Sequence, residues 1–230
     1  GASLARAALS SPSSEFKRPL ASLSFAANYL ATGLDPYWMK LTNLIIHLLN
    51  GWLVFLLARV LVLVAAGDGT TGAARQDFRV GVIAVLIAAG WMLLQINLTG
   101  VLYVVQRMES MANLFVLAGL IGYVTGRRRM LGLAQSSFGG KGLLLCASSI
   151  TLPTAVGILA KETAVMLPLY AFLIEWTLFG FQHTPGATTL TATAAAPMGR
   201  TDHRITVLFV LVLWLPMIAG LSWLVPGMLE

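Results

Sequence analysis

Long runs of apolar residues separated by short polar connections make up most of the chain. The clearest run, 41–66, would extend about 39 Å as a helix at about 1.5 Å per residue, which is enough to cross a bilayer with some tilt. The further runs are 80–96, 98–126, 143–160, 163–181 and 205–225. A spanning helix needs roughly 17 to 25 apolar residues, so the pattern predicts an all-α, polytopic membrane helix bundle over 41–230, with about six transmembrane helices.

Composition narrows the class of protein further. Of the 230 residues, 57% are hydrophobic and 10% are charged, whereas soluble domains carry about 25% charged residues, so a water-soluble globular domain is excluded. The excess of 15 Lys and Arg over 9 Asp and Glu lies mostly in short connections and indicates membrane orientation, with no nucleic-acid partner expected. The single cysteine, Cys146, lies in an apolar run, cannot form an intramolecular disulfide and is expected to be an inert core residue.

Basic residues gather in alternate connections, which gives the chain a direction in the membrane. They lie in the connections 67–79, 127–142 and 182–204. The opposite junctions, 96–99 and 161–162, are very short. By the positive-inside rule the basic connections face the cytoplasm, where Arg127–Arg129 acts as a stop signal, and the short junctions face outside. The segment before the first span then also lies outside, a parity that implies a further helix upstream.

The residues before the first span divide into two segments. Residues 1–14 are small and polar and are predicted to be flexible; they do not begin with methionine, which indicates a removed N-terminal part or a sequence fragment. Residues 15–40 predict an amphipathic helix on the outer membrane surface and a turn, because leucines recur at helical spacing after Pro19. Tyr37 and Trp38 are expected at the membrane interface.

The segment 99–113 carries the most informative polar residues. On one helix they fall within about 120° of one another. They are Thr99, Tyr103, Gln106, Arg107, Ser110 and Asn113, with Glu109 at the edge. A charge at bilayer depth costs about 2.5 to 3.5 kcal/mol, so Arg107 and Glu109 should face protein or a water-filled cavity. A structural ion pair is the alternative to a cavity. Arg107 would suit a phosphate, because its planar fork makes paired hydrogen bonds to oxyanions.

Further candidate residues are predicted at the same membrane face. Lys161 and Glu162 lie at the junction between the fourth and fifth spans. They are either interfacial residues, with Glu162 favouring the start of the next helix, or they place a cation for a lipid-linked phosphate. Arg18 is either an ordinary headgroup-binding residue or a third cation for the same ligand.

The remaining polar residues of the spans are expected to be structural. His47, Asn50 and Glu175 are interpreted as satisfied interhelical groups, because no matching spacing of His or carboxylate residues makes a metal site. Asn97 and Thr99 match a glycosylation sequon that lies too close to the bilayer to be convincing. The sequence contains no phosphate-binding glycine loop, nucleophile elbow or cysteine pair.

Several short motifs together resemble a known class of enzyme. In chain order they are Arg18-Pro19-Leu20, Ser24-Phe25, Asn28-Tyr29, Gly33-Leu34-Asp35-Pro36, Asn43, His47-Leu48-Leu49-Asn50, Tyr103-Val104-Val105-Gln106-Arg107-Met108-Glu109-Ser110 and Ala160-Lys161-Glu162-Thr163. The set resembles multispan glycosyltransferases of the GT-C class, and within it the bacterial relatives of the protein O-mannosyltransferases and of the transmembrane and tetratricopeptide-repeat O-mannosyltransferases. The resemblance runs from about Phe16 to Phe181, and Leu94-Gln95 departs from it, since relatives often have His-Pro there.

The resemblance implies sugar transfer from a polyprenyl-phosphate carrier to a protein or glycan acceptor, on the outer face of a membrane that would be the bacterial inner membrane, with the site facing the periplasm. It implies that Arg18, Arg107 and Lys161 hold the lipid phosphate. The full set of candidate substrate-binding residues is Arg18, Tyr103, Gln106, Arg107, Glu109, Lys161 and Glu162. In such families an acidic motif after a first membrane helix supplies the base or binds a divalent metal, and this chain begins beyond it. The catalytic residue and any cofactor therefore stay unknown, and the chain alone is expected to be inactive.

Two non-enzymatic functions also fit the polar stripe. A transporter or flippase subunit would use it as a translocation path and should show inverted repeats or helices broken near the bilayer centre. A membrane scaffold would use it for packing alone. Substitution of Arg107 with Gln separates the enzyme from the scaffold, because only the enzyme should lose turnover while remaining folded.

Overall fold

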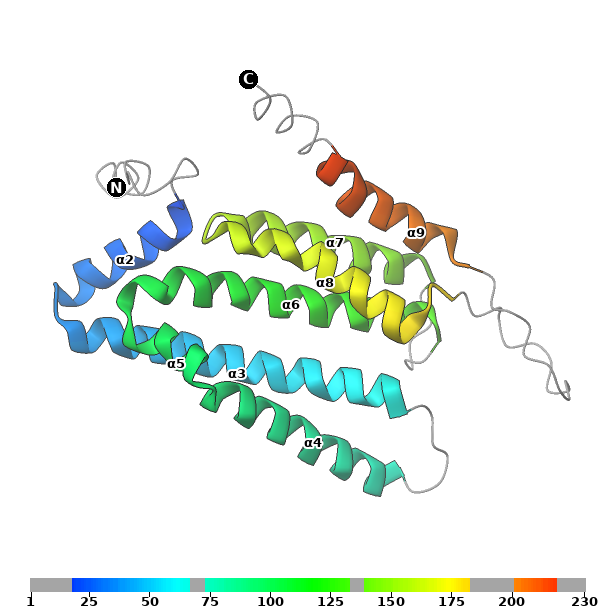
Figure 1. Ribbon diagram of the computed structural model, residues 1–230, viewed down its shortest axis with the longest axis horizontal. Coiled ribbons are helices and arrows are strands. Elements are labelled where there is room, and N and C mark those ends of the chain that lie inside the picture. Colours follow the sequence, from blue (N-terminus) through cyan, green and yellow to red (C-terminus); the bar gives the residue numbers. More distant parts are fainter. Residues whose placement is uncertain (1–17, 67–72, 133–138, 183–200, 219–230) are drawn as a thin grey trace, which may run out of the picture. The chain divides into compact units, whose positions relative to one another are not determined.

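The computed structural model describes residues 18–66, 73–132, 139–182 and 201–218 (Figure 1). Within these ranges the chain is helical and has no strand, apart from an isolated bridge between Gln182 and Thr201. The predicted all-α fold is confirmed. The flexible segment predicted for 1–14 lies outside the described residues.

Five helices of the described ranges are long and apolar enough to cross a membrane. They are Pro36–Ala66, Arg75–Leu93, Val104–Met130, Lys141–Ile158 and Glu162–Phe179. These helices follow the first five predicted spans in order, and they are what an integral membrane protein requires. At the sixth predicted span, 205–225, the structure has a shorter apolar helix, His203–Ile218, and the rest of that span lies beyond the described residues.

The chain divides into two compact units, and each is described by itself. The first unit comprises Gly1–Ile121 and Leu152–Leu167. The second unit comprises Gly122–Thr151 and Pro168–Glu230. Helices α6 (Arg107–Met130) and α7 (Gly139–Ile158) contribute residues to both units.

The first unit opens with helix α2 (Pro19–Thr32), a turn and helix α3 (Pro36–Ala66). Proline at the first position of each helix fits there because that position has no intrahelical use for an N–H group. Gly33 ends α2 with φ 71°, a conformation that glycine adopts without steric cost. Asp35 Oδ1 then accepts a hydrogen bond of 2.9 Å from the backbone N–H at the start of α3. The helix predicted within 15–40 is therefore present as α2, and its place on a membrane surface stays a prediction.

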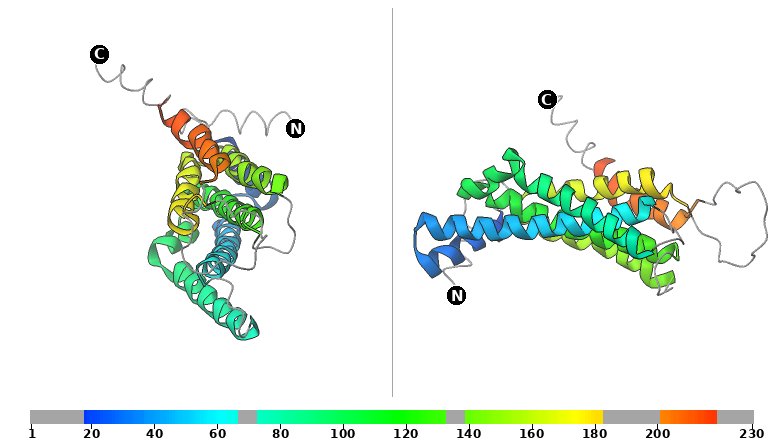
Figure 2. Two further views of the ribbon diagram at one scale, coloured as in Figure 1. Left: turned by 90° about the vertical axis from the view of Figure 1, so that its right-hand side faces the viewer. Right: turned by 90° about the horizontal axis from the view of Figure 1, so that it is seen from below.

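Helix α4 (Ala73–Leu93) returns along α3 (Figure 1; Figure 2 shows the pair from two further directions). Its buried residues Val80, Ala84 and Ala88 recur every fourth position and form one small-residue face. Small side chains let two membrane helices approach closely, which favours this pairing over contact with lipid. On α3, a Cβ added to Gly51 would collide with the side chain of Met92, which would have to move, so Gly51 lets Met92 pack closely at that crossing.

The predicted helix over 98–126 is wrong in one respect, because the structure breaks it at Tyr103. Helix α5 (Gln95–Leu102) ends there, Tyr103 is extended with φ −97° and ψ 115°, and a 3₁₀ turn (Val104–Gln106) leads into α6. The side chain of Asn43 on α3 donates to the carbonyl of Tyr103 at 3.4 Å and to that of Val101 at 3.5 Å. Asn43 thus satisfies backbone groups that the break would otherwise leave without partners.

The second unit contains the last part of α6, the first part of α7, and helix α8 (Leu167–Ile174) from Pro168 onward with its π-helical continuation (Glu175–Phe179). It also contains helix α9 (His203–Phe209). Its core includes residues that are at most 1% exposed: Tyr123, Val124, Cys146, Ile150 and Phe209. Burial of Cys146 agrees with its predicted role as an inert core residue.

Candidate functional site

A polar cavity of about 440 Å³ lies within the first unit. Residues of α3, α4, α5, the 3₁₀ turn and α6, together with the junction after α7, form its walls. The lining residues are His47, Asn50, Trp91, Ile96, Asn97, Thr99, Gly100, Gln106, Glu109, Ser110, Asn113 and Lys161. Because most of these side chains are amides, hydroxyls or charged groups, the cavity offers hydrogen-bond donors and acceptors among otherwise apolar helices.

The break at Tyr103 is what brings the polar residues of 99–113 to the cavity. Residues on both sides of the break, Thr99 and Gly100 on α5 and Glu109 and Ser110 on α6, line the same space. A Cβ added to Gly100 would stand 2.8 Å from Ser110 Oγ, so glycine permits this close approach of α5 to α6. The stripe expected on one continuous helix is therefore folded into two facing walls.

A charged pair stands at the cavity wall. Lys161 Nζ donates to Glu109 Oε2, and Thr163 Oγ1 donates to Glu109 Oε1 at 3.1 Å. The Lys161 and Glu109 side chains are 26% and 42% exposed. Lys161 has an extended backbone (φ −159°, ψ 145°) between α7 and the 3₁₀ turn Glu162–Met166. The residues predicted at this tight junction therefore meet those predicted at the start of α6.

The third predicted cation, Arg18, pairs with Glu162, which follows Lys161 at the same junction. Its Nη2 donates to Glu162 Oε1 at 2.7 Å, and its Nη1 lies 3.6 Å from Met108 Sδ. Arg18 is held with φ 30°, which is uncommon for a residue with a side chain. Neither Arg18 nor Glu162 is among the cavity-lining residues.

Arg107 lies outside the cavity lining, in contrast to the expectation that it holds a ligand phosphate there. The residue is 0% exposed. Its guanidinium donates to Asn43 Oδ1 at 2.7 Å and to the carbonyls of Met39 at 2.9 Å and Ser24 at 3.4 Å, and it stacks 4.6 Å from the ring centroid of Phe25. These contacts connect the start of α6 to α2 and α3. The geometry supports the alternative considered for a buried charge, namely interhelical packing.

The other predicted site residues are separated by the same break. Gln106 lines the cavity, whereas Tyr103 does not and is 63% exposed. Of the seven candidates, Gln106, Glu109 and Lys161 therefore lie together at the cavity.

Residues first interpreted as structural contribute to the cavity as well. His47 Nε2 lies 3.3 Å from the carbonyl of Met92, and its ring stacks on Trp91 with centroids 5.5 Å apart. Asn50 Nδ2 donates to the carbonyl of Ser110 at 2.8 Å. Both residues make the interhelical contacts that were predicted, and both also line the cavity. The signal that could have identified this role is the spacing of Asn43, His47 and Asn50, which places them on one face of α3.

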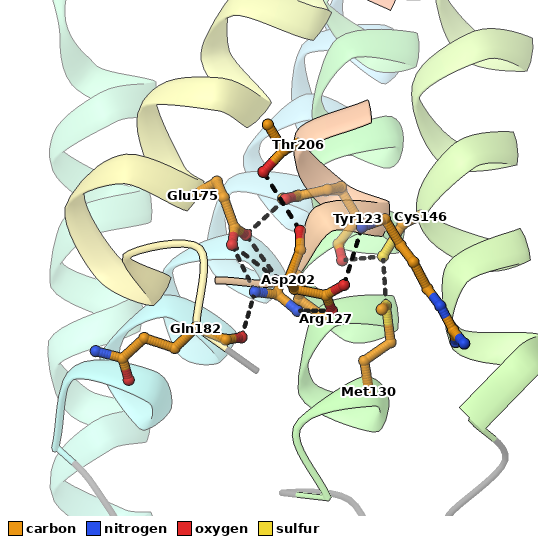
Figure 3. A network of polar contacts seen from close by, with 9 residues as sticks. Tyr123, Arg127, Met130, Cys146, Glu175, Gln182, Asp202 and Thr206 are labelled. Atoms are coloured by element: carbon orange, nitrogen blue, oxygen red, sulfur yellow. Dashed lines mark hydrogen bonds and ion pairs between the residues drawn. The ribbon is translucent and has the colours of Figure 1, made fainter. Parts of the chain in front are cut away.

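A second polar cluster lies in the core of the second unit (Figure 3). Arg127 and Glu175 are both 0% exposed and form a bidentate pair, with Arg127 Nη2 to Glu175 Oε1 at 2.6 Å and Nε to Oε2 at 2.9 Å. Tyr123 Oη donates to Glu175 Oε2 at 2.6 Å, and Asp202 Oδ2 lies 3.6 Å from Arg127 Nη1. Glu175 is thus the satisfied interhelical group that was predicted.

The prediction that Arg127–Arg129 lie in a connection is wrong, whereas their place on the cytoplasmic side of the membrane stays a prediction. Helix α6 continues through Arg127–Arg129 to Met130, so these arginines lie on a helix and not in a connection. Arg127 lies one helical turn after Tyr123, on the buried face, and Arg129 is exposed. The spacing of Tyr123 and Arg127 was the available signal for an inward-facing arginine.

No group of three or more His, Cys, Asp or Glu residues able to hold a metal ion occurs in the part of the chain that the structure describes.

The helices and the cavity together define a polytopic α-helical membrane protein with a polar, ligand-sized cavity in one of its units. Over 45 residues, 20% of the chain, the sequence is 51% identical to the Protein O-mannosyl-transferase Tmtc1 of Drosophila melanogaster. The matched stretch covers 5% of the length of that protein. No family model matches the chain, and no solved structure matches it.

Proposed function

We propose that this chain is part of a membrane glycosyltransferase and that its cavity binds a sugar donor linked to a polyprenyl phosphate. The observation that carries the proposal is the cavity of about 440 Å³, which is polar although the surrounding helices are apolar. Its volume lies within the roughly 300 to 1,000 Å³ of small-molecule sites. The partial similarity to an O-mannosyl-transferase supports the choice of a sugar as the ligand.

The lining residues supply the chemistry that a sugar needs. Amide side chains such as Asn50 and Gln106 both donate and accept, which suits hydroxyl groups that do the same. Trp91 adds an aromatic surface against which a pyranose ring can pack. In this proposal the sugar occupies the part of the cavity between α3, α4 and α6.

Lys161 is the group assigned to the donor phosphate. A phosphate leaving group gains negative charge as the bond to the sugar breaks, and a fixed cation beside it lowers the energy of that transition state. The acceptor hydroxyl must lose a proton to a general base, and no residue of this chain is assigned to that step. Arg107 acts as a positioning residue, because it anchors the start of the helix that carries Glu109.

The cavity is proposed to open on the non-cytoplasmic side of the membrane. Glu109 lies in the first turn of α6, and Arg127–Arg129 lie in its last turn. By the positive-inside rule the end of α6 with the arginines faces the cytoplasm. In a bacterial inner membrane the cavity would then face the periplasm, where the acceptor would be a protein or a glycan.

A binding experiment tests the proposal. The chain, reconstituted in phosphatidylcholine nanodiscs, is titrated with a short-chain isoprenyl-phosphate mannose, and with GDP-mannose and free mannose as comparisons. We expect saturable binding of the isoprenyl-phosphate mannose, and no saturable binding of GDP-mannose or free mannose. Lys161→Gln should weaken this binding by about 10- to 150-fold, since a charge-assisted contact contributes roughly 1.5 to 3 kcal/mol.

Lys40→Gln is the matched control, because Lys40 is an exposed cation on α3 that does not line the cavity. It should leave the affinity unchanged. Absence of binding, or equal weakening by both lysine substitutions, would argue against the proposal. Movement of the bound lipid across a liposome membrane would favour a flippase. Assembly of the chain with other membrane proteins, without any ligand binding, would favour a scaffold.

A further inference from the structure

The cations around the cavity already have partners. Lys161 is paired with Glu109, and Arg18 is paired with Glu162 at 2.7 Å. Arg107 is occupied by Asn43 and by two backbone carbonyls. A phosphate that enters the cavity therefore competes with the Glu109 carboxylate for the charge of Lys161.

The geometry of the Lys161 pair permits such an exchange. Both side chains are partly exposed, at 26% and 42%, and ion pairs in contact with water contribute little net stability. Separation of the two charges is therefore inexpensive. The fully buried pair of Arg127 and Glu175, at 0% and 0%, could not open in this way without leaving a charge in the core.

Glu109 has a second contact that does not depend on Lys161. Thr163 Oγ1 donates to Glu109 Oε1 at 3.1 Å, whereas Lys161 binds the other oxygen, Oε2. If the ammonium of Lys161 turns to a ligand, the carboxylate stays attached to Thr163 through Oε1. Its Oε2 is then free to accept a hydrogen bond from a ligand hydroxyl in the cavity.

We propose, building on the proposed function, that Glu109 is an internal competitor for Lys161, and that the phosphate of an anionic ligand displaces the Glu109 carboxylate from the Lys161 ammonium. Glu109 therefore lowers the affinity of the cavity for phosphate alone. A ligand that carries both a phosphate and a sugar recovers this loss, because its hydroxyl groups use the released oxygen of Glu109. The pair of Lys161 and Glu109 therefore favours binding of a polyprenyl phosphate that carries a sugar over binding of the same phosphate without a sugar.

The competition predicts opposite effects for the two partners. Removal of the Lys161 charge should weaken phosphate binding. Removal of the Glu109 charge should strengthen it, because Lys161 then has no competing anion. A pair with a purely structural function would give losses for both substitutions or changes for neither.

Farnesyl phosphate is the probe, titrated into the chain in phosphatidylcholine nanodiscs, with farnesol and inorganic phosphate in parallel. We expect Glu109→Gln to bind farnesyl phosphate about 2- to 5-fold more tightly than the unmodified chain, and Lys161→Gln to bind it more weakly. Farnesol should respond to neither substitution. Glu109→Ala should show the same gain in affinity for farnesyl phosphate. Because alanine has no polar side chain, this variant excludes a hydrogen bond from the introduced glutamine amide as the cause.

Asp77→Asn is the matched control. Asp77 pairs with Arg59 at 2.8 Å in the same unit, with side chains 59% and 42% exposed, and neither residue lines the cavity. The substitution changes the net charge equally and also releases an arginine. Its affinity for farnesyl phosphate should stay that of the unmodified chain.

Four results would overturn the inference. Equal or weaker binding by both Glu109 variants, with weaker binding by Lys161→Gln, would show that Glu109 does not compete while the proposed donor site stands. An equal gain with Asp77→Asn would assign the effect to overall charge. Binding of inorganic phosphate as tightly as farnesyl phosphate would identify a free-phosphate site and not a lipid headgroup. If neither the unmodified chain nor any variant bound farnesyl phosphate, the inference and the proposed donor site would both fail.

Discussion

The two units each contain an arginine or lysine paired with a glutamate, and the pairs differ mainly in their contact with water. Arg127 and Glu175 are completely buried, and three further contacts surround them: a hydrogen bond from Tyr123, one from Arg127 to the Gln182 carbonyl, and an ion pair with Asp202. Lys161 and Glu109 are partly exposed at a cavity wall. The same charge chemistry therefore supports a fixed packing contact in one unit and an exchangeable binding contact in the other.

The difference follows from the cost of leaving one charge alone. In a buried pair the remaining charge has neither water nor a partner, so breaking the pair costs several kcal/mol. In a partly exposed pair water solvates the remaining charge, and the cost is small. Burial, more than the identity of the residues, decides which function a charged pair can have.

The largest expected effect comes from the buried pair. Arg127→Met leaves Glu175 and Asp202 in the core without their cation, so the free energy of unfolding should fall by about 3 to 5 kcal/mol. Thermal or detergent-induced unfolding of the reconstituted chain measures this loss. Arg129→Met, on the exposed side of the same helical turn, is the control and should change stability little. Equal losses would show that the burial of Arg127 is not what makes it important.

A smaller loss is expected at Arg107. Arg107→Gln removes charge-assisted hydrogen bonds to Asn43 Oδ1 and to the Met39 carbonyl, which should cost about 2 to 3 kcal/mol of unfolding free energy. Arg107→Lys should recover only part of it, because one ammonium cannot reproduce the fork that reaches separate acceptors. Unfolding curves of the two variants test this. Full stability of Arg107→Gln together with lost ligand binding would instead return Arg107 to the ligand-binding role.

Tyr123→Phe probes the hydrogen-bonding shell of the buried pair. It removes the 2.6 Å hydrogen bond to Glu175 but keeps the arginine, so a loss of about 1.5 kcal/mol is expected. Tyr170→Phe is a matched control, since Tyr170 is 44% exposed on the neighbouring helix α8. A loss as large as that of Arg127→Met would mean that the hydroxyl, and not the cation, holds the cluster together.

The smallest effect on stability is expected at the cavity pair. A double-mutant cycle with Lys161→Gln and Glu109→Gln should give a coupling free energy below about 1 kcal/mol. The same cycle with Arg127→Met and Glu175→Gln should give several kcal/mol. Coupling at the cavity as strong as in the core would contradict an exchangeable pair.

The sequence predicts the membrane bundle well, because a spanning helix is a local property of a run of apolar residues. The tight junction at 161–162 and the turn at Asp35 were predictable for the same reason. The break at Tyr103 was not, since Asn43, about sixty residues earlier, satisfies the freed carbonyls. A pattern read along one helix does not contain that contact.

The charged residues show the same limit. Glu109 and Lys161 were predicted at one membrane face, but their pairing joins residues 52 positions apart. Arg107 and Arg127 each lie in a polar or basic stretch that indicated a ligand site or a solvated connection. Both are buried, and each binds a partner that is distant in the sequence: Asn43 for Arg107 and Glu175 for Arg127. The sequence around each arginine therefore did not indicate its burial. Charge patterns identify residues that need partners, and the fold decides which partners they find.

Photo-crosslinking tests the central claim most directly. An isoprenyl-phosphate mannose with a diazirine on the mannose ring is bound to the reconstituted chain and irradiated, and the crosslinked residues are mapped by mass spectrometry. The account predicts crosslinks that fall on the cavity wall, at Trp91, Gln106 or Ser110, and that excess unlabelled ligand removes. Crosslinks confined to exposed apolar residues such as Leu86 or Trp176, and unaffected by competitor, would contradict it.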